Sequence, residues 1–202
     1  MRSVTEQEEF WQGSFGDEYT DRNTSGHSSN VALFSRVLGK TRGVSRIFEI
    51  GVNRGLNLDA LYAVAPNVKL SGIEINARAA ALAKKRHSGV IEGSILSTPI
   101  EGQYDLVFTK GVLIHIAPEK LPDVYVRMSE LSRRYVLIAE YYSPQPVAIN
   151  YRGHSEKLFK RDFAGEFMDA TGFALVDYGF FYRRDPVYPA DDINWFLMER
   201  RS

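Results

Sequence analysis

The sequence predicts an α/β fold in three layers, in which a mostly parallel sheet of seven strands ends in one antiparallel strand. Short apolar segments alternate with segments of helical periodicity between residues 46 and 139, a pattern typical of consecutive parallel strands. No helical segment separates the last two apolar segments, so the final strand is expected to run against its neighbour. The 202 residues are 44% hydrophobic, enough for one substantial core, and we therefore expect a single domain.

The expected elements follow one another in a regular order. The predicted strands are short apolar runs, and they cover Arg46–Ile50, Val68–Glu74, Val90–Glu92, Tyr104–Phe108, Tyr135–Ala139, Phe173–Tyr178 and Asn194–Glu199. The predicted helices have apolar residues at helical spacing or are rich in alanine, and they cover Ser28–Lys40, Gly55–Val64, Asn76–His87, a segment opening at Pro118, and Arg161–Ala170. Because strand and helix alternate, the strands between them are expected to be parallel.

Two segments fall outside this alternation. Residues 1–27 are rich in aromatic and acidic side chains without a clean period, which predicts an irregular or partly helical cap, or lid, on a core of residues 28–202. The segment Tyr141–Lys157 contains two prolines, a glycine and several polar residues, which predicts a long surface loop. Such loops are usually functional, so we expect a substrate to bind within residues 141–160.

Composition and charge exclude several classes of function. The 25 basic residues balance 25 acidic residues, which argues against nucleic acid as a partner. The chain has no cysteine, which excludes disulfides, zinc thiolate sites and cysteine nucleophiles, and we predict no metal site. The polar, acidic start does not resemble a signal peptide, and no apolar run approaches the ~18 residues of a membrane span. We expect a cytoplasmic protein without a membrane partner, as a monomer or homodimer.

The strongest motif is FEIGVNRGLNL at residues 48–58, where the first strand meets the next helix. Gly51 and Gly55 let the backbone turn tightly and approach a ligand closely, and the amides that open the helix suit a carboxylate. A dinucleotide fingerprint would need glycine at positions 53 and 56, which are Asn53 and Leu56. A methyltransferase motif needs an acid at Glu49 and glycines at 51, 53 and 55. Only Asn53 departs from it, and asparagine tolerates positive φ well.

Further candidate residues follow the next strands. Glu74 ends the second strand, where a carboxylate can accept hydrogen bonds from both ribose hydroxyls of an adenosine, with Ile75 and Asn76 beside it. The third and fourth strands are followed by two more sets of candidates, namely Gly93, Ser94, Ile95, and Lys110, Gly111, Val112. By itself, a glycine turn often has a structural role without binding a ligand, and an acid at the end of a strand is often simply exposed to solvent. Their joint order predicts a Rossmann-like class I methyltransferase that binds S-adenosyl-L-methionine and releases S-adenosyl-L-homocysteine.

Longer stretches of the chain resemble one family. EQEEFWQGSFGDEYTDRN at the start, YDLVFTKGVLIHI in the middle, and AEYYSPQPVAINYRGHSEKLFKRDFAGE and VDYGFFYRRDPVYPADDINWFL later are similar to the pseudaminic acid biosynthesis-associated methylases. These are class I S-adenosylmethionine-dependent methyltransferases found beside bacterial surface-sugar genes. The resemblance extends over nearly the whole chain and implies a role in sugar biosynthesis.

The residues that would serve methylation can be named from chemistry. A hydroxyl or ammonium acceptor must lose a proton, and the candidate bases are His115, Glu140 and His154, whereas a carboxylate acceptor needs no base. An aromatic face favours a sulfonium cation, so the cap could close over the cofactor through Trp11, Tyr19 and Arg22. The basic excess between residues 152 and 162 favours a small anionic acceptor, such as a sugar acid or nucleotide sugar, bound by Tyr141, Tyr142, Tyr151, Arg152 and Lys157.

Other functions stay open at this stage. The first alternative is a cofactor-binding regulatory or partner protein without transferase activity. The polar, aromatic segment at the strand ends argues against it, because that segment has little purpose without an acceptor. The second is methylation of RNA or protein, which the balanced charge and the absence of an appended binding domain disfavour.

Overall fold

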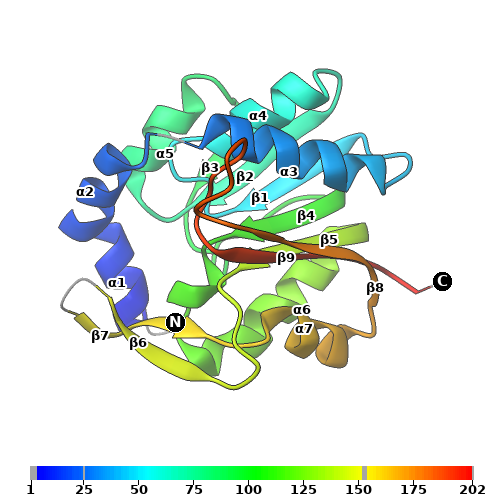
Figure 1. Ribbon diagram of the computed structural model, residues 1–202. Helices are drawn as coiled ribbons and strands as arrows, with labels where there is room; N and C mark the ends of the chain where they lie inside the picture. The colour runs from blue at the N-terminus through cyan, green and yellow to red at the C-terminus, as the bar shows by residue number, and fades with distance from the viewer. Residues whose placement is uncertain (1–3, 25, 152–153, 202) are drawn as a thin grey trace.

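The computed structural model describes residues 4–24, 26–151 and 154–201, with the backbone alone for residues 150, 151 and 154–157. One sheet has the strand order β3-β2-β1-β4-β5-β9-β8 (Figure 1). The strands are β1 (Arg46–Ile50), β2 (Lys69–Glu74), β3 (Val90–Glu92), β4 (Tyr104–Lys110), β5 (Ser132–Glu140), β8 (Ala174–Phe181) and β9 (Ile193–Glu199). Strand β9 runs antiparallel to both β5 and β8, and the pairs among β1 to β5 are parallel. The predicted sheet is confirmed.

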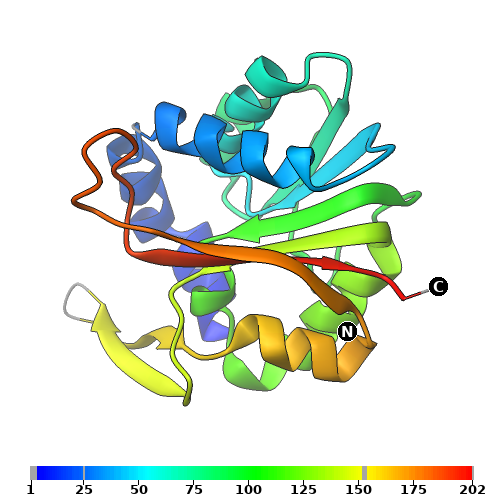
Figure 2. The same cartoon turned by 45° about the vertical axis from the view of Figure 1, so that its right-hand side comes forward.

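Helices cover both faces of this sheet (Figures 1 and 2). One face packs against α3 (His27–Gly39), α4 (Leu56–Val64) and α5 (Ala77–Lys84), and its core includes Phe34, Leu58 and Phe108. The other face packs against α6 (Leu121–Leu131) and α7 (Phe163–Thr171), and its core includes Phe48, Met128 and Phe167. Two short 3-10 turns, η1 (Leu113–His115) and η2 (Pro118–Lys120), connect β4 to α6. Each face thus buries its own apolar cluster, as the three-layer prediction requires.

The strand register gathers chemically active residues at one end of the sheet. Ile50 pairs with Ile73, so the last residues of β1 and β2 lie side by side. Lys110 pairs with Ala139, which brings the ends of β4 and β5 together. In open α/β sheets, ligands bind outside the carboxyl ends of the strands, so this end is where a site is expected.

The N-terminal segment is more regular than predicted, because it forms two helices, α1 (Glu6–Gln12) and α2 (Ser14–Arg22). We call residues 5–22 the cap. Helix α1 begins with a capping box, in which the Thr5 side chain accepts from the Glu8 backbone and the Glu8 side chain accepts from the Thr5 backbone. The motif Thr-x-x-Glu is visible in the sequence and could have predicted this start. The cap stands beside the carboxyl ends of the strands (Figure 1).

The prediction of a long surface loop at Tyr141–Lys157 is wrong. Most of this segment forms an antiparallel hairpin of β6 (Val147–Tyr151) and β7 (His154–Lys160), which projects from the molecule in Figure 2. Ile149 pairs with Leu158, and Leu158 is buried in the core on the α6 and α7 face. The prolines that favoured a loop precede the first strand, so they start the hairpin without interrupting its ladder.

Candidate functional site

The bend between β1 and α4 has an unusual backbone. Gly51, Asn53 and Gly55 all have positive φ, at 75°, 48° and 91°. A Cβ on Gly51 would lie 2.4 Å from Val112 Cγ2, so the residue must be glycine for the loop after β4 to approach. Among the residues that the structure describes, Asn53 is the one non-glycine residue with positive φ. Asparagine tolerates this conformation well. The bend therefore takes the shape expected of a glycine motif despite the asparagine.

Glu74 faces this bend from the end of β2. Its carboxylate accepts hydrogen bonds from the backbone N–H of Asn53 at 2.6 Å and of Asn76 at 2.8 Å. The side chain is buried, and burial raises its pKa despite these backbone hydrogen bonds. The backbone of Ile75 contributes a third hydrogen bond. A carboxylate offers about four lone-pair positions, so one more donor can be accepted. Asn76 itself caps α5, because its Oδ1 accepts from Ala79 N at 2.9 Å.

Glu49 is fully buried on β1, directly before the bend. Its Oε1 accepts from Asn57 Nδ2 at 2.6 Å, whereas its Oε2 has no hydrogen-bond partner among the residues that the structure describes. Burial raises the pKa of Glu49 well above its ordinary value, although nearby Lys110 opposes this shift. Burial also lowers the pKa of Lys110. A buried carboxylate oxygen without a donor is costly, so this position favours binding of a cationic or donor group from a ligand.

The cap is bonded directly to these strand-end loops. Asn76 Nδ2 donates to Asp17 Oδ1 at 2.9 Å and to the Trp11 carbonyl at 3.2 Å. Ser94 Oγ, after β3, donates to Glu8 Oε1 at 2.5 Å. Sequence reasoning missed Glu8 and Asp17, because acidic residues on a short helix normally lie in solvent. Their partners show that the cap covers the predicted cofactor residues.

The three predicted lid residues have different positions. The Trp11 ring lies 4.5 Å from the ring of His115, on the turn after β4, so it reaches the strand ends. The Tyr19 ring packs edge-on against Trp11 at 5.2 Å. Arg22 pairs with Glu18 at 3.4 Å on the same helix, and its guanidinium lies over the Phe15 ring. The structure therefore does not bring Arg22 to the strand ends.

Glu140 holds the loop after β4 in place. Its Oε1 accepts from Thr109 Oγ1 at 3.2 Å and from the backbone N–H of Val112 and Leu113 at 2.9 and 3.0 Å. Its Oε2 has no partner within the described part of the chain. Burial raises the pKa of Glu140 to about 7, and hydrogen bonds from the backbone of Val112, Leu113 and Ile114 and from the Thr109 side chain oppose the shift. This predicted base therefore positions a loop with one oxygen, while its other oxygen is buried and has no described hydrogen-bond partner.

The remaining predicted site residues lie in several different surroundings. Gly93 and Gly111 have positive φ, Ile95 is buried in the core, and His115 is buried beside Trp11. The Tyr141 ring lies under the ammonium group of Lys160 at 5.1 Å, and Tyr142 is exposed. Arg152 and the side chains of Tyr151, His154 and Lys157 lie outside the described residues. Their predicted roles in base catalysis and acceptor binding are untested.

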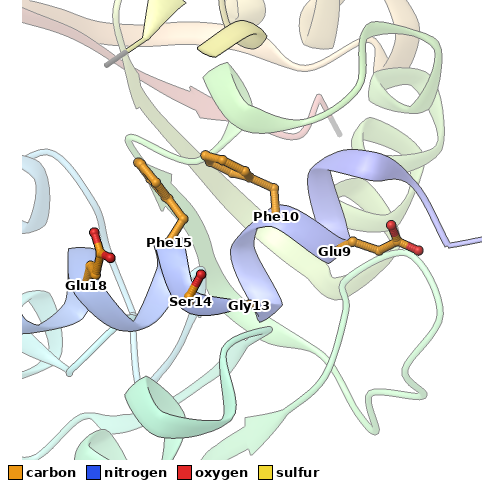
Figure 3. Close-up of a pocket in the computed structure, with 6 residues that line it drawn as sticks. All are labelled: Glu9, Phe10, Gly13, Ser14, Phe15 and Glu18. Atoms are coloured by element: carbon orange, nitrogen blue, oxygen red, sulfur yellow. The ribbon is translucent and has the colours of Figure 1, made fainter. Parts of the chain in front are cut away.

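One hollow of about 390 Å³ lies on the cap and not at the strand ends (Figure 3). The rings of Phe10 and Phe15 stack at 4.2 Å along it, and its remaining lining residues are Glu9, Gly13, Ser14 and Glu18. Every lining residue belongs to the cap, so this hollow involves none of the strand-end groups. We therefore locate the site by the buried carboxylates. Among the described residues, no three histidine, aspartate or glutamate side chains gather as a metal site.

Solved structures identify the fold as that of S-adenosylmethionine-dependent class I methyltransferases. The magnesium protoporphyrin IX methyltransferase of Synechocystis PCC 6803, solved with S-adenosylmethionine, has a TM-score of 0.71 at 12% identity over 100% of both chains. An amino pentose methyltransferase from Micromonospora echinaspora gives 0.65 at 13% identity over 100% of both chains. The 1,6-didemethyltoxoflavin-N1-methyltransferase of Burkholderia thailandensis gives 0.70 at 14% identity, over 100% of this chain and 93% of that one.

No family model and no curated protein sequence matches the chain. The resemblance to the pseudaminic acid biosynthesis-associated methylases thus stays a prediction, whereas the methyltransferase fold is confirmed. No helix within residues 4–24, 26–151 and 154–201 has the length and apolarity needed to span a bilayer.

Proposed function

We propose that this protein is an S-adenosylmethionine-dependent methyltransferase that modifies a small metabolite. The observation that carries the proposal is the buried Glu49 Oε2, which lacks a described partner directly before the positive-φ bend. Such an oxygen suits the α-ammonium group of the cofactor, and Glu74 faces the same bend with room for a hydroxyl donor. The methyltransferase fold supports this interpretation.

The other parts of the cofactor have candidate partners nearby. The amides that open α4 after Gly55 suit the cofactor carboxylate, because the first N–H groups of a helix have no partner within the helix. Ser94 and Ile95 follow β3, where the adenine would lie, and Lys110, Gly111 and Val112 border the bend from β4. When bound, S-adenosylmethionine supplies a methyl group already activated on a sulfonium. The chain's own task is then to position an acceptor and exclude water.

The acceptor would bind beside the end of β5 and the β6–β7 hairpin. The named substrates of several structural neighbours, among them an amino pentose and a sugar, support a small molecule as acceptor. We propose an anionic acceptor, such as a sugar acid or nucleotide sugar, because the hairpin segment contains the basic residues Arg152 and Lys157. His115, Glu140 and His154 remain the candidate bases for a hydroxyl or ammonium acceptor.

Calorimetry with S-adenosylhomocysteine tests the cofactor site. We expect saturable binding at one site per chain, weakened at least tenfold in Glu74→Ala and unchanged in Glu101→Gln, which alters an exposed acid before β4. Well-folded protein that gives no saturable heat would overturn the proposal. Incubation with labelled S-adenosylmethionine and a metabolite extract then separates a transferase from a cofactor-binding regulator, because only a transferase passes the label to another molecule.

A further inference from the structure

A small niche opens beside Glu140 on the α7 face of the sheet. Its volume is about 10 Å³, close to what one water molecule or one small polar group needs. It lies between the end of β5, the start of α7 and β9, and its lining residues are Ile138, Glu140, Tyr142, Arg161, Phe163, Ala164 and Phe196. The niche therefore admits one functional group of a ligand, while the rest of the ligand would lie over the residues at its mouth.

The niche contains the carboxylate of Glu140, one oxygen of which accepts no hydrogen bond from a described residue. Glu140 is 3% exposed, and its Oε2 has no partner within the described residues. Oε1 already accepts from Thr109, Val112 and Leu113, so the side chain cannot rotate to satisfy Oε2 without releasing the loop after β4. A ligand that donates a hydrogen bond here would remove the cost of a buried unpaired oxygen.

The charges around the niche favour a cationic donor. Arg161 lines the niche, but its Nε donates to Glu166 Oε1 at 2.7 Å, so a neighbouring carboxylate already neutralises it. Tyr125 donates its hydroxyl to Glu166 Oε2 at 2.9 Å, which fixes this second carboxylate. The ionised Glu140 then leaves one net negative charge among the niche groups Glu140, Arg161 and Glu166. Lys110 interacts with Glu140 as well, but its strongest charge interaction is with Glu49. An anionic group would have to compete with Glu166 for the guanidinium.

The mouth of the niche is aromatic. The rings of Tyr142 and Phe196 lie 6.1 Å apart, and Tyr178 stacks on Phe196 at 6.3 Å with an interplanar angle of 17°. Tyr142 is 41% exposed and Tyr178 61% exposed, so these rings present apolar surface to solvent beside a buried carboxylate. Aromatic faces attract cations, which agrees with the charge balance inside the niche.

We propose that the niche is the acceptor subsite for a protonated amine, which Glu140 Oε2 receives while Tyr142 and Phe196 contact the carbon skeleton beside it. This inference rests on the proposed methyltransferase function and names the chemical class of acceptor that would use it. It agrees with the anionic acceptor proposed above when one molecule has both an acidic group and an amine. Glu140 Oε2 would hold a proton taken from the ammonium. A pKa near neutrality is compatible with this exchange.

Benzylamine, benzyl alcohol and benzoate form a matched set of probes, because they share a flat ring and differ in the attached group. Binding to the full chain saturated with S-adenosylhomocysteine is followed by ligand-observed NMR at neutral pH. We expect saturable binding of benzylamine, with benzyl alcohol at least tenfold weaker and benzoate weaker still. In Glu140→Gln the amide oxygen can still accept from Val112 and Leu113, so the loop is kept while the charge is lost.

Benzylamine affinity should fall at least tenfold in Glu140→Gln, fall several-fold in Tyr142→Ala, and stay unchanged in Glu101→Gln. Because Tyr142 is exposed, its variant keeps the test informative even when the Glu140 variant folds poorly. Equal affinity for amine and alcohol, tighter binding of benzoate than of benzylamine, no binding of any of the three probes, or an unchanged benzylamine affinity in both niche variants would each overturn the amine subsite. None of these outcomes affects the calorimetric result for S-adenosylhomocysteine. A lack of saturable S-adenosylhomocysteine binding would instead contradict the methyltransferase proposal.

Discussion

The backbone N–H of Asn53 donates to Glu74 Oε2 over 2.6 Å and so joins the bend after β1 to the end of β2. The bond links the two segments that the proposed cofactor would bridge, and Glu74 also accepts from Asn76 N. One carboxylate therefore sets the relative position of three segments, namely the bend, the end of β2 and the start of α5. The conformation of the bend depends on the same side chain that would contact the ribose.

Glu74→Gln should lower the affinity for S-adenosylhomocysteine by about 10- to 100-fold, because charge-assisted hydrogen bonds contribute about 1.5–3 kcal/mol. The amide can still accept one backbone N–H, so the protein should stay folded. Calorimetry measures the affinity, and circular dichroism checks the fold. An affinity within threefold of that of the unmodified protein would contradict the role given to Glu74.

Glu49→Gln should raise stability and lower cofactor affinity together. Burial raises the pKa of Glu49, so the folded state binds more protons than the unfolded state and loses stability as pH increases. A neutral amide removes this cost and can also donate to Asn57 Oδ1, a buried acceptor without a described partner. Thermal unfolding at pH 8 should show a higher midpoint, and calorimetry a loss of at least tenfold in affinity. A variant with lower stability and intact affinity would argue against this account.

Gly16→Ala should loosen the cap. An added Cβ would lie 2.0 Å from the Trp11 carbonyl oxygen and 2.8 Å from Asn76 Nδ2, both of which take part in docking the cap. Overpacking of this kind costs about 1–3 kcal/mol. Hydrogen exchange should become faster in α1 and α2 and stay unchanged in β4 and β5. Gly39→Ala is the matched control, because nothing lies within 4 Å of its added Cβ.

Glu140→Gln should change how stability depends on pH. The pKa of Glu140 increases from 4.5 to about 7 on folding, so the folded state holds the extra proton between these values. The free energy of unfolding therefore falls as pH rises from 4.5 to 7, by about 3 kcal/mol from this group. Lys110, Tyr125, Arg161 and Glu166 remain charged or bonded nearby in both proteins. Urea unfolding at pH 5 and pH 8 should show a smaller decline in the variant, and equal declines would contradict the assignment.

The sequence predicted the sheet well because the central strands β1, β4 and β5 are largely buried and apolar, and helical periods separate them. The end of β1 at Ile50 and the end of β2 at Glu74 agree with prediction to the residue. The hairpin was missed because Pro144 and Pro146, followed by several polar residues, favoured a loop, and β7 has no regular alternation of apolar and polar residues. Local patterns cannot show that Leu158 and Ile149 pack against a core built from elements far along the chain.

The candidate site was only partly predictable, for a different physical reason. Glu49 and Glu74 follow from a pattern within one strand-helix-strand unit, β1–α4–β2, so their spacing along the chain reports their spacing in the fold. The niche joins β5, β9 and the start of α7, and no local spacing relates Glu140 to Arg161 and Phe196. Glu8 and Asp17 likewise reach partners far along the sequence, so only the folded chain brings them to the strand ends.

The docking of the cap has a consequence for the order of folding. Glu8 and Ser94 are 86 positions apart, and Asp17 and Asn76 are 59 positions apart, so α1 and α2 leave the ribosome before their partners and must wait for them. Contacts of such sequence separation require costly loop closure. The sheet contains pairings of similar separation, but it also positions the strand ends that carry Asn76 and Ser94, so we expect the cap contacts to form after the central sheet. Substitutions in the cap should therefore speed unfolding and leave the refolding rate nearly unchanged, which stopped-flow kinetics can measure. The cap, made before the sheet, would reach its final position after it.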